Sequence, residues 1–215
     1  MTLTLNIAGI SDETDRIRVF ELTPAGAEAL PAWTPGAHLC FDLGPAGSRS
    51  YSLIAWPGQQ DGRYRIAVQR EDEGSGGSKA MHGLKPGDRL TATPPKNDFE
   101  LGDHAGPALL LAGGIGITPM IAMATALSAE GRDFRLVYAA RSRAVMGFGA
   151  ALGSAFGDRV TLAFDDETPL DLDALMAGLD ARTHLYVCGP RGMIEAARAA
   201  AARAGLPGDQ VHVEL

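Results

Sequence analysis

The chain has 215 residues, of which 46% are hydrophobic, and this is enough to bury one large core or two modest ones. Its formal net charge of -7 argues against nucleic acid and anionic membranes as partners. The sequence shows no signal peptide and no apolar run of membrane-spanning length, so we expect a cytoplasmic protein. Cys40 and Cys188 could form at most one bridge, and we expect both to be reduced thiols.

The first half is predicted to be β-structure throughout. Short segments that partly alternate apolar and polar residues are separated by Gly, Pro and Asp turns, which favours a six-stranded antiparallel Greek-key β-barrel. Ser78 to Leu84 adds a helical turn with Ser78 as its cap. The predicted strands are residues 3–10, 17–23, 37–43, 49–54, 64–69 and 89–93.

From Pro107 onward, buried strands alternate with helical segments. This alternation predicts a doubly wound α/β domain with a parallel sheet. The change of pattern predicts two domains, residues 1–103 and residues 104–215. The predicted strands are 109–112, 134–139, 160–164, 185–188 and 210–215, and the predicted helices are 120–130, 147–156, one capped by Thr168-Pro169, and 193–204.

The glycine cluster that follows the strand 109–112 carries the strongest functional signal. Gly113-Gly114-Ile115-Gly116 is followed at once by Thr118 and Pro119, which we expect to be the cap and the first position of a helix. Glycines without Cβ atoms and free amides at a helix N-terminus favour a nucleotide pyrophosphate. Pro119 stands where a third glycine would complete a Rossmann fingerprint, so a purely structural strand-turn-helix is the alternative.

Two stretches of the first half have residues suited to bind a ligand that carries a phosphate and a flat heterocyclic ring. Arg49-Ser50-Tyr51-Ser52-Leu53 is predicted to be a strand with Arg49 and Tyr51 on one face, where a guanidinium can bind phosphate and a ring can stack on a flat heterocycle. Gly76-Gly77-Ser78 can form a nest of backbone N–H groups for a terminal phosphate. A surface strand and a flexible hairpin loop are the respective alternatives.

The third such stretch, Val187-Cys188-Gly189-Pro190, ends a buried strand. It places a thiol at the carboxyl edge of a parallel sheet, where ligands bind in α/β folds. A cysteine in an apolar strand is, however, more often part of the core. The five histidines show no metal-ligand spacing, so no metal site is predicted and they are interpreted as structural or solvated. The acidic run Asp165-Asp166-Glu167 is interpreted as a solvated loop.

Taken in order, the motifs RSYS, GGS, AGGIGITPM, VCGP and the terminal VHVE resemble those of the ferredoxin-reductase superfamily. Within it, they resemble the group of phthalate dioxygenase reductase and vanillate demethylase reductase, across essentially the whole chain. The resemblance implies a flavin-binding barrel followed by a nicotinamide-binding α/β domain. It also implies a flavin-dependent NAD(P)H oxidoreductase, the reductase component of an electron-transfer chain that ends in an oxygenase or demethylase.

The same resemblance implies roles for individual residues. Arg49 and Ser78 would hold the flavin phosphate, and Tyr51 would stack on the isoalloxazine. Ser52, Cys188 and Glu214 would act at the site of hydride transfer as positioning groups. The implied cofactor-binding residues are Arg49, Ser50, Tyr51, Ser52, Ala67, Val68, Gln69, Gly76, Gly77 and Ser78 for the flavin, and Gly113, Gly114, Gly116, Thr118, Arg141, Ser142, Cys188, Gly189 and Pro190 for the dinucleotide.

The resemblance favours FMN over FAD, and NADH over NADPH. Arg141-Ser142-Arg143 follows the strand 134–139, however, where an NAD site would show an acidic residue, and these arginines could instead pair with a 2′-phosphate. Two cysteines cannot hold the four-thiolate 2Fe-2S cluster that such reductases usually carry. We therefore expect electrons to pass to a separate ferredoxin or to a missing ferredoxin domain, and then to a terminal oxygenase. A non-catalytic nucleotide-binding module, or a fragment of a larger reductase, is the alternative.

Overall fold

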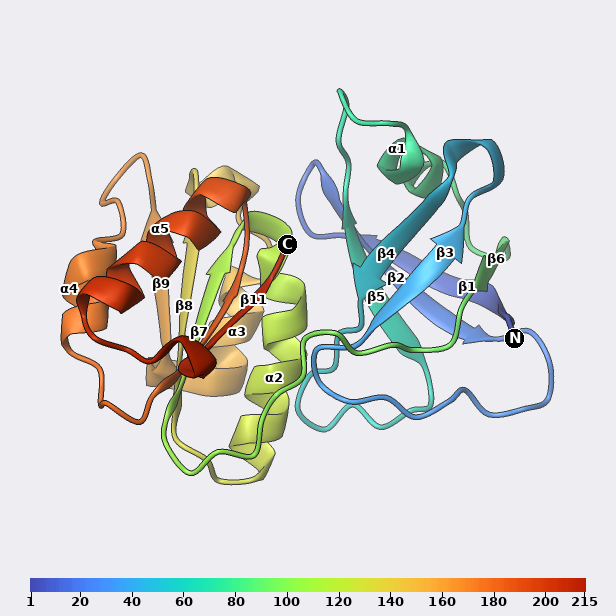
Figure 1. Ribbon diagram of the computed structural model, residues 1–215. Coiled ribbons are helices and arrows are strands. Elements are labelled where there is room, and N and C mark those ends of the chain that lie inside the picture. The colour runs from blue at the N-terminus through green and yellow to red at the C-terminus, as the bar shows by residue number, and fades with distance from the viewer. The chain divides into compact units, whose positions relative to one another are not determined.

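The computed structural model describes residues 1–215. The chain divides into two compact units, Met1–Glu100 and Leu101–Leu215, and each has a sheet of its own (Figure 1). The division falls after Glu100, whereas the sequence prediction set it after residue 103. No helix combines the length and the apolar character needed to cross a bilayer.

The first unit is a six-stranded sheet in which every pairing is antiparallel, in the order β4-β3-β6-β1-β2-β5. This confirms the predicted all-β antiparallel architecture. One short helix, α1, lies between β5 and β6. The bounds are β1 Leu3–Asp12, β2 Ile17–Pro24, β3 His38–Asp42, β4 Ser48–Ser52, β5 Tyr64–Gln69, α1 Gly77–His82 and β6 Arg89–Ala92.

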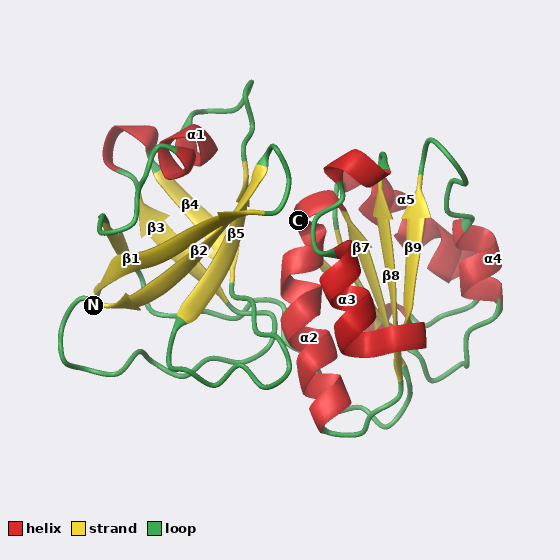
Figure 2. Ribbon diagram, turned by 180° about the vertical axis from the view of Figure 1, so that it is seen from behind, coloured by secondary structure: helices red, strands yellow, loops and turns green.

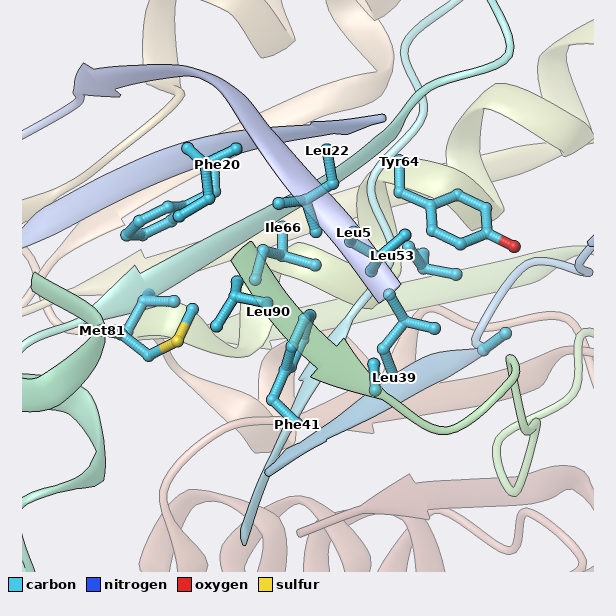
Figure 3. Close-up of a cluster of buried hydrophobic side chains, with 14 residues drawn as sticks. Leu5, Phe20, Leu22, Leu39, Phe41, Leu53, Tyr64, Ile66, Met81 and Leu90 are labelled. Carbon is cyan, nitrogen blue, oxygen red and sulfur yellow. The ribbon is translucent and has the colours of Figure 1, made fainter. Parts of the chain in front are cut away.

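Alternation along these strands sends one set of side chains into a single core. Figure 3 shows that core, in which Phe20 of β2, Leu39 and Phe41 of β3, and Ile66 of β5 are fully buried. The thioether of Met81 enters the same core from α1. Burial of each such side chain is worth about 1.5–3 kcal/mol, so α1 is held to the sheet by packing although it is only six residues long.

The second unit is a five-stranded parallel sheet in the order β11-β10-β7-β8-β9. Helices α2 and α3 cover one face and α4 and α5 the other (Figure 2), which confirms the predicted doubly wound α/β fold. The bounds are β7 Ala108–Gly113, α2 Ile117–Ala129, β8 Phe134–Ala140, α3 Gly149–Phe156, β9 Val160–Phe164, α4 Leu172–Ala177, β10 His184–Cys188, α5 Arg191–Arg203 and β11 Val211–Glu214.

The central strand β7 is buried along its whole length, as expected of a strand covered on both faces. Leu109 and Leu111 pack against Ile194 and Ala197 of α5. Because successive side chains point to opposite faces, Leu110 is directed to the other layer of helices. The apolar run of this strand therefore fixes its central position in the sheet.

Three predicted helix caps are wrong. The cap of α1 is Gly76, at φ 98°, rather than Ser78, because a left-handed backbone there favours glycine. The cap of α2 is Gly116, and the Thr118 hydroxyl donates to the carbonyl of Ile115 at 3.2 Å instead. The cap of α4 is Asp171, whose carboxylate accepts the Ala174 N–H at 3.0 Å, rather than Thr168. An ionised carboxylate is a strong N-cap acceptor.

Candidate functional site

The first part of the candidate site is a phosphate cradle made by Arg49 on β4 and the loop before α1. The Arg49 guanidinium donates to the Ser48 carbonyl at 2.7 Å and to the Ser75 hydroxyl. A Cβ atom at Gly77 would lie 2.4 Å from Arg49 Nε, so only glycine allows the guanidinium to lie against this loop. The structure thus brings together Arg49 and the Gly76-Gly77 turn, which lie more than 25 residues apart in the sequence.

Ser78 has a different local role from that of a cap. Its hydroxyl oxygen accepts the backbone N–H of Glu71 at 2.8 Å, which closes the loop between β5 and α1. A hydroxyl can donate and accept at the same time, so its proton is still available to a phosphate oxygen. Ser78 lies one residue beyond Gly77, beside the cradle.

Tyr51 lies on the same face of β4 as Arg49, next to the core. It pairs with Leu39 across the ladder, and its ring packs against Phe41 at a centroid distance of 6.0 Å. Burial raises the pKa of Tyr51, although the Arg49 charge acts in the opposite direction. The side chain is therefore a neutral phenol ring, held on one side by the core and suited to stack on a flat heterocycle.

The remaining flavin residues implied by the sequence belong to β4 and β5. Ser50 and Ser52 pair with Cys40 and His38 of β3, which places both serines on the face opposite Arg49 and Tyr51. On β5, Ala67 and Val68 are buried, and the Gln69 side chain donates to Glu71 at 2.8 Å. Gln69 thus has a partner within its own loop.

The second part of the candidate site is the edge of the parallel sheet where β7 and β10 end. A Cβ atom at Gly116 would lie 2.2 Å from the Cys188 carbonyl oxygen, and one at Gly113 would lie 2.3 Å from the Met193 sulfur. A Cβ atom at Gly189 would lie 3.1 Å from the Gly113 amide nitrogen. These three glycines therefore allow the β7–α2 and β10–α5 turns to pack closely.

Gly114 differs from these glycines, since nothing lies within 4 Å of a Cβ atom built on it. Its φ of 56° lies in the left-handed region, which favours glycine for its conformation rather than for packing. The backbone at Gly114 is therefore open to a ligand at the carboxyl edge. Pro190 is the N-cap residue of α5, so the VCGP motif leads directly into a helix start, as the GGIGITP motif does.

Cys188 and Glu214 are register partners at the ends of β10 and β11. The thiol lies 3.9 Å from Glu214 Oε2. Burial, and then the neighbouring carboxylate, raise the pKa of Cys188 to about 12. Cys188 is therefore a neutral thiol at physiological pH, suited to contact and hydrogen bonding and not to nucleophilic attack.

Arg141, Ser142 and Arg143 follow β8 at the same edge of the sheet. Arg143 Nε lies 3.0 Å from Glu167 Oε2, and its guanidinium lies 4.3 Å from the centre of the Phe164 ring. Glu167 was predicted only to be part of a solvated loop. The missed signal is topological: β8 and β9 are parallel neighbours, so the segments that follow them meet at one edge.

A cluster of histidines at the opposite edge was also missed. The rings of His104 and His184 stack at 3.7 Å, and His184 Nδ1 lies 2.9 Å from His212 Nε2. His104 Nε2 lies 2.9 Å from the Tyr186 hydroxyl, which accepts the Gly102 N–H. No group of three or more His, Cys, Asp or Glu side chains could hold a metal ion. Only the order of the strands brings these residues together, which explains why no spacing revealed them.

No family model matches the chain. It is 38% identical over 218 residues to the phenoxybenzoate dioxygenase subunit beta of Ectopseudomonas oleovorans, covering 99% of this chain and 66% of that one. It is 40% identical over 189 residues to the vanillate O-demethylase oxidoreductase of Pseudomonas putida, covering 86% and 59%. The chain thus spans about two thirds of the length of these relatives.

Among solved structures, the chain is similar to phthalate dioxygenase reductase, described as a modular structure for electron transfer from pyridine nucleotides to [2Fe-2S]. The TM-score is 0.90 with 35% identity, and the match covers 99% of this chain and 67% of the other. The fold, an antiparallel β unit followed by a parallel α/β unit, is that of the ferredoxin-reductase type. The chain belongs to the family of phthalate dioxygenase reductase and vanillate demethylase reductase.

Proposed function

We propose that this chain is the flavin- and pyridine-nucleotide-binding part of a reductase that takes electrons from NADH and passes them to an iron-sulfur centre serving an oxygenase or demethylase. The observation that carries this proposal is the pair of cradles, one in each unit. Arg49 lies against Gly77 in the first, and Gly116 lies against the Cys188 carbonyl in the second. At Gly116 the obstacle to a side chain is backbone, whereas at Gly77 it is the Arg49 side chain, which a larger residue 77 would push away from the loop.

The first unit fits a flavin mononucleotide. The Arg49 guanidinium and the amides after Gly76 present positive charge and N–H donors in one place, which suits a terminal phosphate. Tyr51 supplies a neutral ring on the same strand. This argument favours FMN over FAD, since the cradle suits a phosphate that ends the ligand. The first unit is thus proposed to be the flavin-binding domain that the sequence predicted at residues 1–103.

The second unit fits the dinucleotide, in keeping with the nucleotide-binding domain predicted at residues 104–215. The open backbone at Gly114 and the N-terminus of α2 favour a pyrophosphate, with Gly189 and Pro190 on the neighbouring turn. In this proposal Cys188 and Glu214 contact the nicotinamide end and orient it, and Ser52 donates a hydrogen bond to the flavin ring. No protein nucleophile takes part, in keeping with the neutral thiol of Cys188.

Bound flavin would supply the chemistry that the side chains lack, because it accepts hydride as an electron pair and releases electrons singly. The protein contributes orientation, which lowers the entropic part of the barrier. The chain has two cysteines, both free, whereas a plant-type 2Fe-2S cluster needs four thiolates. The acceptor cluster therefore lies outside these 215 residues, on a ferredoxin or on a ferredoxin domain.

A steady-state assay tests this function. The FMN-loaded chain should oxidise NADH with ferricyanide as acceptor, yet should support an oxygenase of a related system only when a 2Fe-2S ferredoxin is added. Efficient coupling without added ferredoxin would contradict the proposal. Stoichiometric iron and acid-labile sulfide in the purified chain would contradict it as well.

A further inference from the structure

Two loops at the carboxyl edge of the second unit are tied to each other by backbone hydrogen bonds. Strands β8 and β9 end opposite one another, at Ala140 and Phe164. The Asp165 N–H donates to the Ala140 carbonyl at 3.0 Å, and the Asp166 N–H donates to the Arg141 carbonyl at 3.2 Å. The segment after β9 is therefore fixed beside the arginine-bearing segment after β8.

This backbone arrangement holds an acidic and a basic side chain together. Glu167 closes a turn, since its N–H donates to the Phe164 carbonyl at 3.0 Å. Its carboxylate then lies 3.0 Å from Arg143 Nε, and the Arg143 guanidinium lies over the Phe164 ring. One guanidinium thus has both an aromatic and an anionic partner before any ligand is bound.

The pair borders a groove of about 570 Å³. Arg143, Phe164, Glu167 and Thr168 line the end near the carboxyl edge, and Thr161 lines the other end. In a doubly wound sheet, the adenosine ribose of a dinucleotide binds beyond the carboxyl ends of the strands. A carboxylate there accepts hydrogen bonds from ribose hydroxyls, whereas an arginine accommodates a 2′-phosphate.

We propose that Glu167 determines the coenzyme preference of this chain, by holding Arg143 as its counter-ion and by presenting a carboxylate to the ribose 2′-hydroxyl. This inference rests on the proposed function. A 2′-phosphate would have to displace Glu167 from Arg143 and would lie next to a like charge. A 2′-hydroxyl can donate to the same carboxylate and leave the ion pair intact, so the arrangement favours NADH despite the two arginines.

The Arg143–Glu167 ion pair is too exposed to contribute much to the stability of the fold. The Arg143 and Glu167 side chains are 71% and 48% exposed, and an exposed ion pair contributes little to stability. Replacing Glu167 should therefore leave the fold unchanged and act on the ligand. We expect Glu167→Gln to tighten NADP⁺ binding about three- to tenfold, because it frees Arg143 for bidentate phosphate contact.

Calorimetric titration of the FMN-loaded full chain with NADP⁺ and with NAD⁺ tests the inference, alongside NADH oxidation with ferricyanide. Asp166→Asn is the matched control, since it removes one negative charge from an exposed side chain next to Glu167 and leaves the Arg143–Glu167 pair in place. The double variant Glu167→Gln/Arg143→Ala should lose the gain in NADP⁺ affinity. The Asp166 variant should keep the ratio of NADP⁺ to NAD⁺ affinity of the original chain.

An unchanged ratio in Glu167→Gln, in a chain that still oxidises NADH, would overturn this inference and leave the proposed function standing. An equal shift in Asp166→Asn, or a gain that survives in the double variant, would also overturn it, because Glu167 would then not act through Arg143. A chain that neither binds nor oxidises either dinucleotide would overturn the inference and the proposed function together.

Discussion

Gly116 and Cys188 approach so closely that a Cβ atom on the glycine would lie 2.2 Å from the cysteine carbonyl oxygen. The obstacle is backbone, which cannot move aside as a flexible side chain can. The two turns at the carboxyl edge of β7 and β10 thus share one packing constraint. The proposed pyrophosphate site depends on it.

Gly116→Ala should therefore lower the free energy of unfolding by about 1–3 kcal/mol, as overpacking does, and should weaken dinucleotide binding. The matched control is Gly153→Ala on α3, where nothing lies within 4 Å of the added Cβ atom. The control should raise stability by up to about 1 kcal/mol. Urea unfolding of both variants measures the difference. Equal stability of the two would show that the turns do not pack as described.

Arg49→Ala should release most of the flavin. A charge-assisted phosphate contact worth about 2–3 kcal/mol corresponds to FMN binding that is about 30- to 150-fold weaker. Fluorescence titration with FMN measures the dissociation constant. Arg63→Ala is the control, since Arg63 pairs with Glu21 at 2.9 Å on the surface of the same unit. Full flavin content in the Arg49 variant would refute the phosphate cradle.

The two cysteines should differ sharply in reactivity. Cys40 is partly exposed, whereas Cys188 is buried with its pKa raised to about 12, so little thiolate forms at pH 8. Iodoacetamide should modify Cys40 first in the folded chain and reach Cys188 only on unfolding. Peptide mass analysis identifies the modified residue. Rapid modification of Cys188 in the folded chain would show that its thiol is not buried beside Glu214.

The histidine cluster should make stability fall as the pH is lowered. Burial is the main cause that lowers the pKa values of His104, His184 and His212 below 6.5. The positive charge of Arg132 lowers the pKa values of His104 and His184 further. The negative charge of Asp209 acts in the opposite direction on His184 and His212. Below pH 6.5 the unfolded chain therefore takes up protons that the folded cluster does not, and folding is disfavoured.

His184→Gln should flatten this dependence, since it removes one such group and the direct contact with His212 at 2.9 Å. Thermal melting from pH 7.5 to pH 5.5 measures the slope of Tm against pH for both chains. A control is His38→Gln, outside the cluster on β3. Equal slopes for His184→Gln and the original chain would mean that the cluster does not couple protonation to folding.

The sequence was most informative where a single strand or turn determines the structure. The apolar run of β7 predicted a central strand of the parallel sheet, because burial on both faces leaves few alternatives. The caps at Ser78, Thr118 and Thr168 were mispredicted, since several nearby residues could cap each helix and packing decides among them.

Contacts that depend on the order of the strands in the sheet could not be predicted from the sequence. The Arg143–Glu167 pair joins segments 24 residues apart, and His104 meets Tyr186 across 82 residues. Neither pairing has a local signature. Both follow only from which strands lie side by side, β8 with β9 and β10 with β7 and β11.

The most direct test of the account is an anaerobic absorbance titration of the chain after incubation with FMN and gel filtration. We predict that flavin is retained at one equivalent per chain and that one equivalent of NADH bleaches its visible absorbance. Retention that is lost in Arg49→Ala but kept in Arg63→Ala would locate the flavin at the proposed cradle. A chain that retains no flavin, or whose flavin absorbance is unchanged by NADH, would contradict the account.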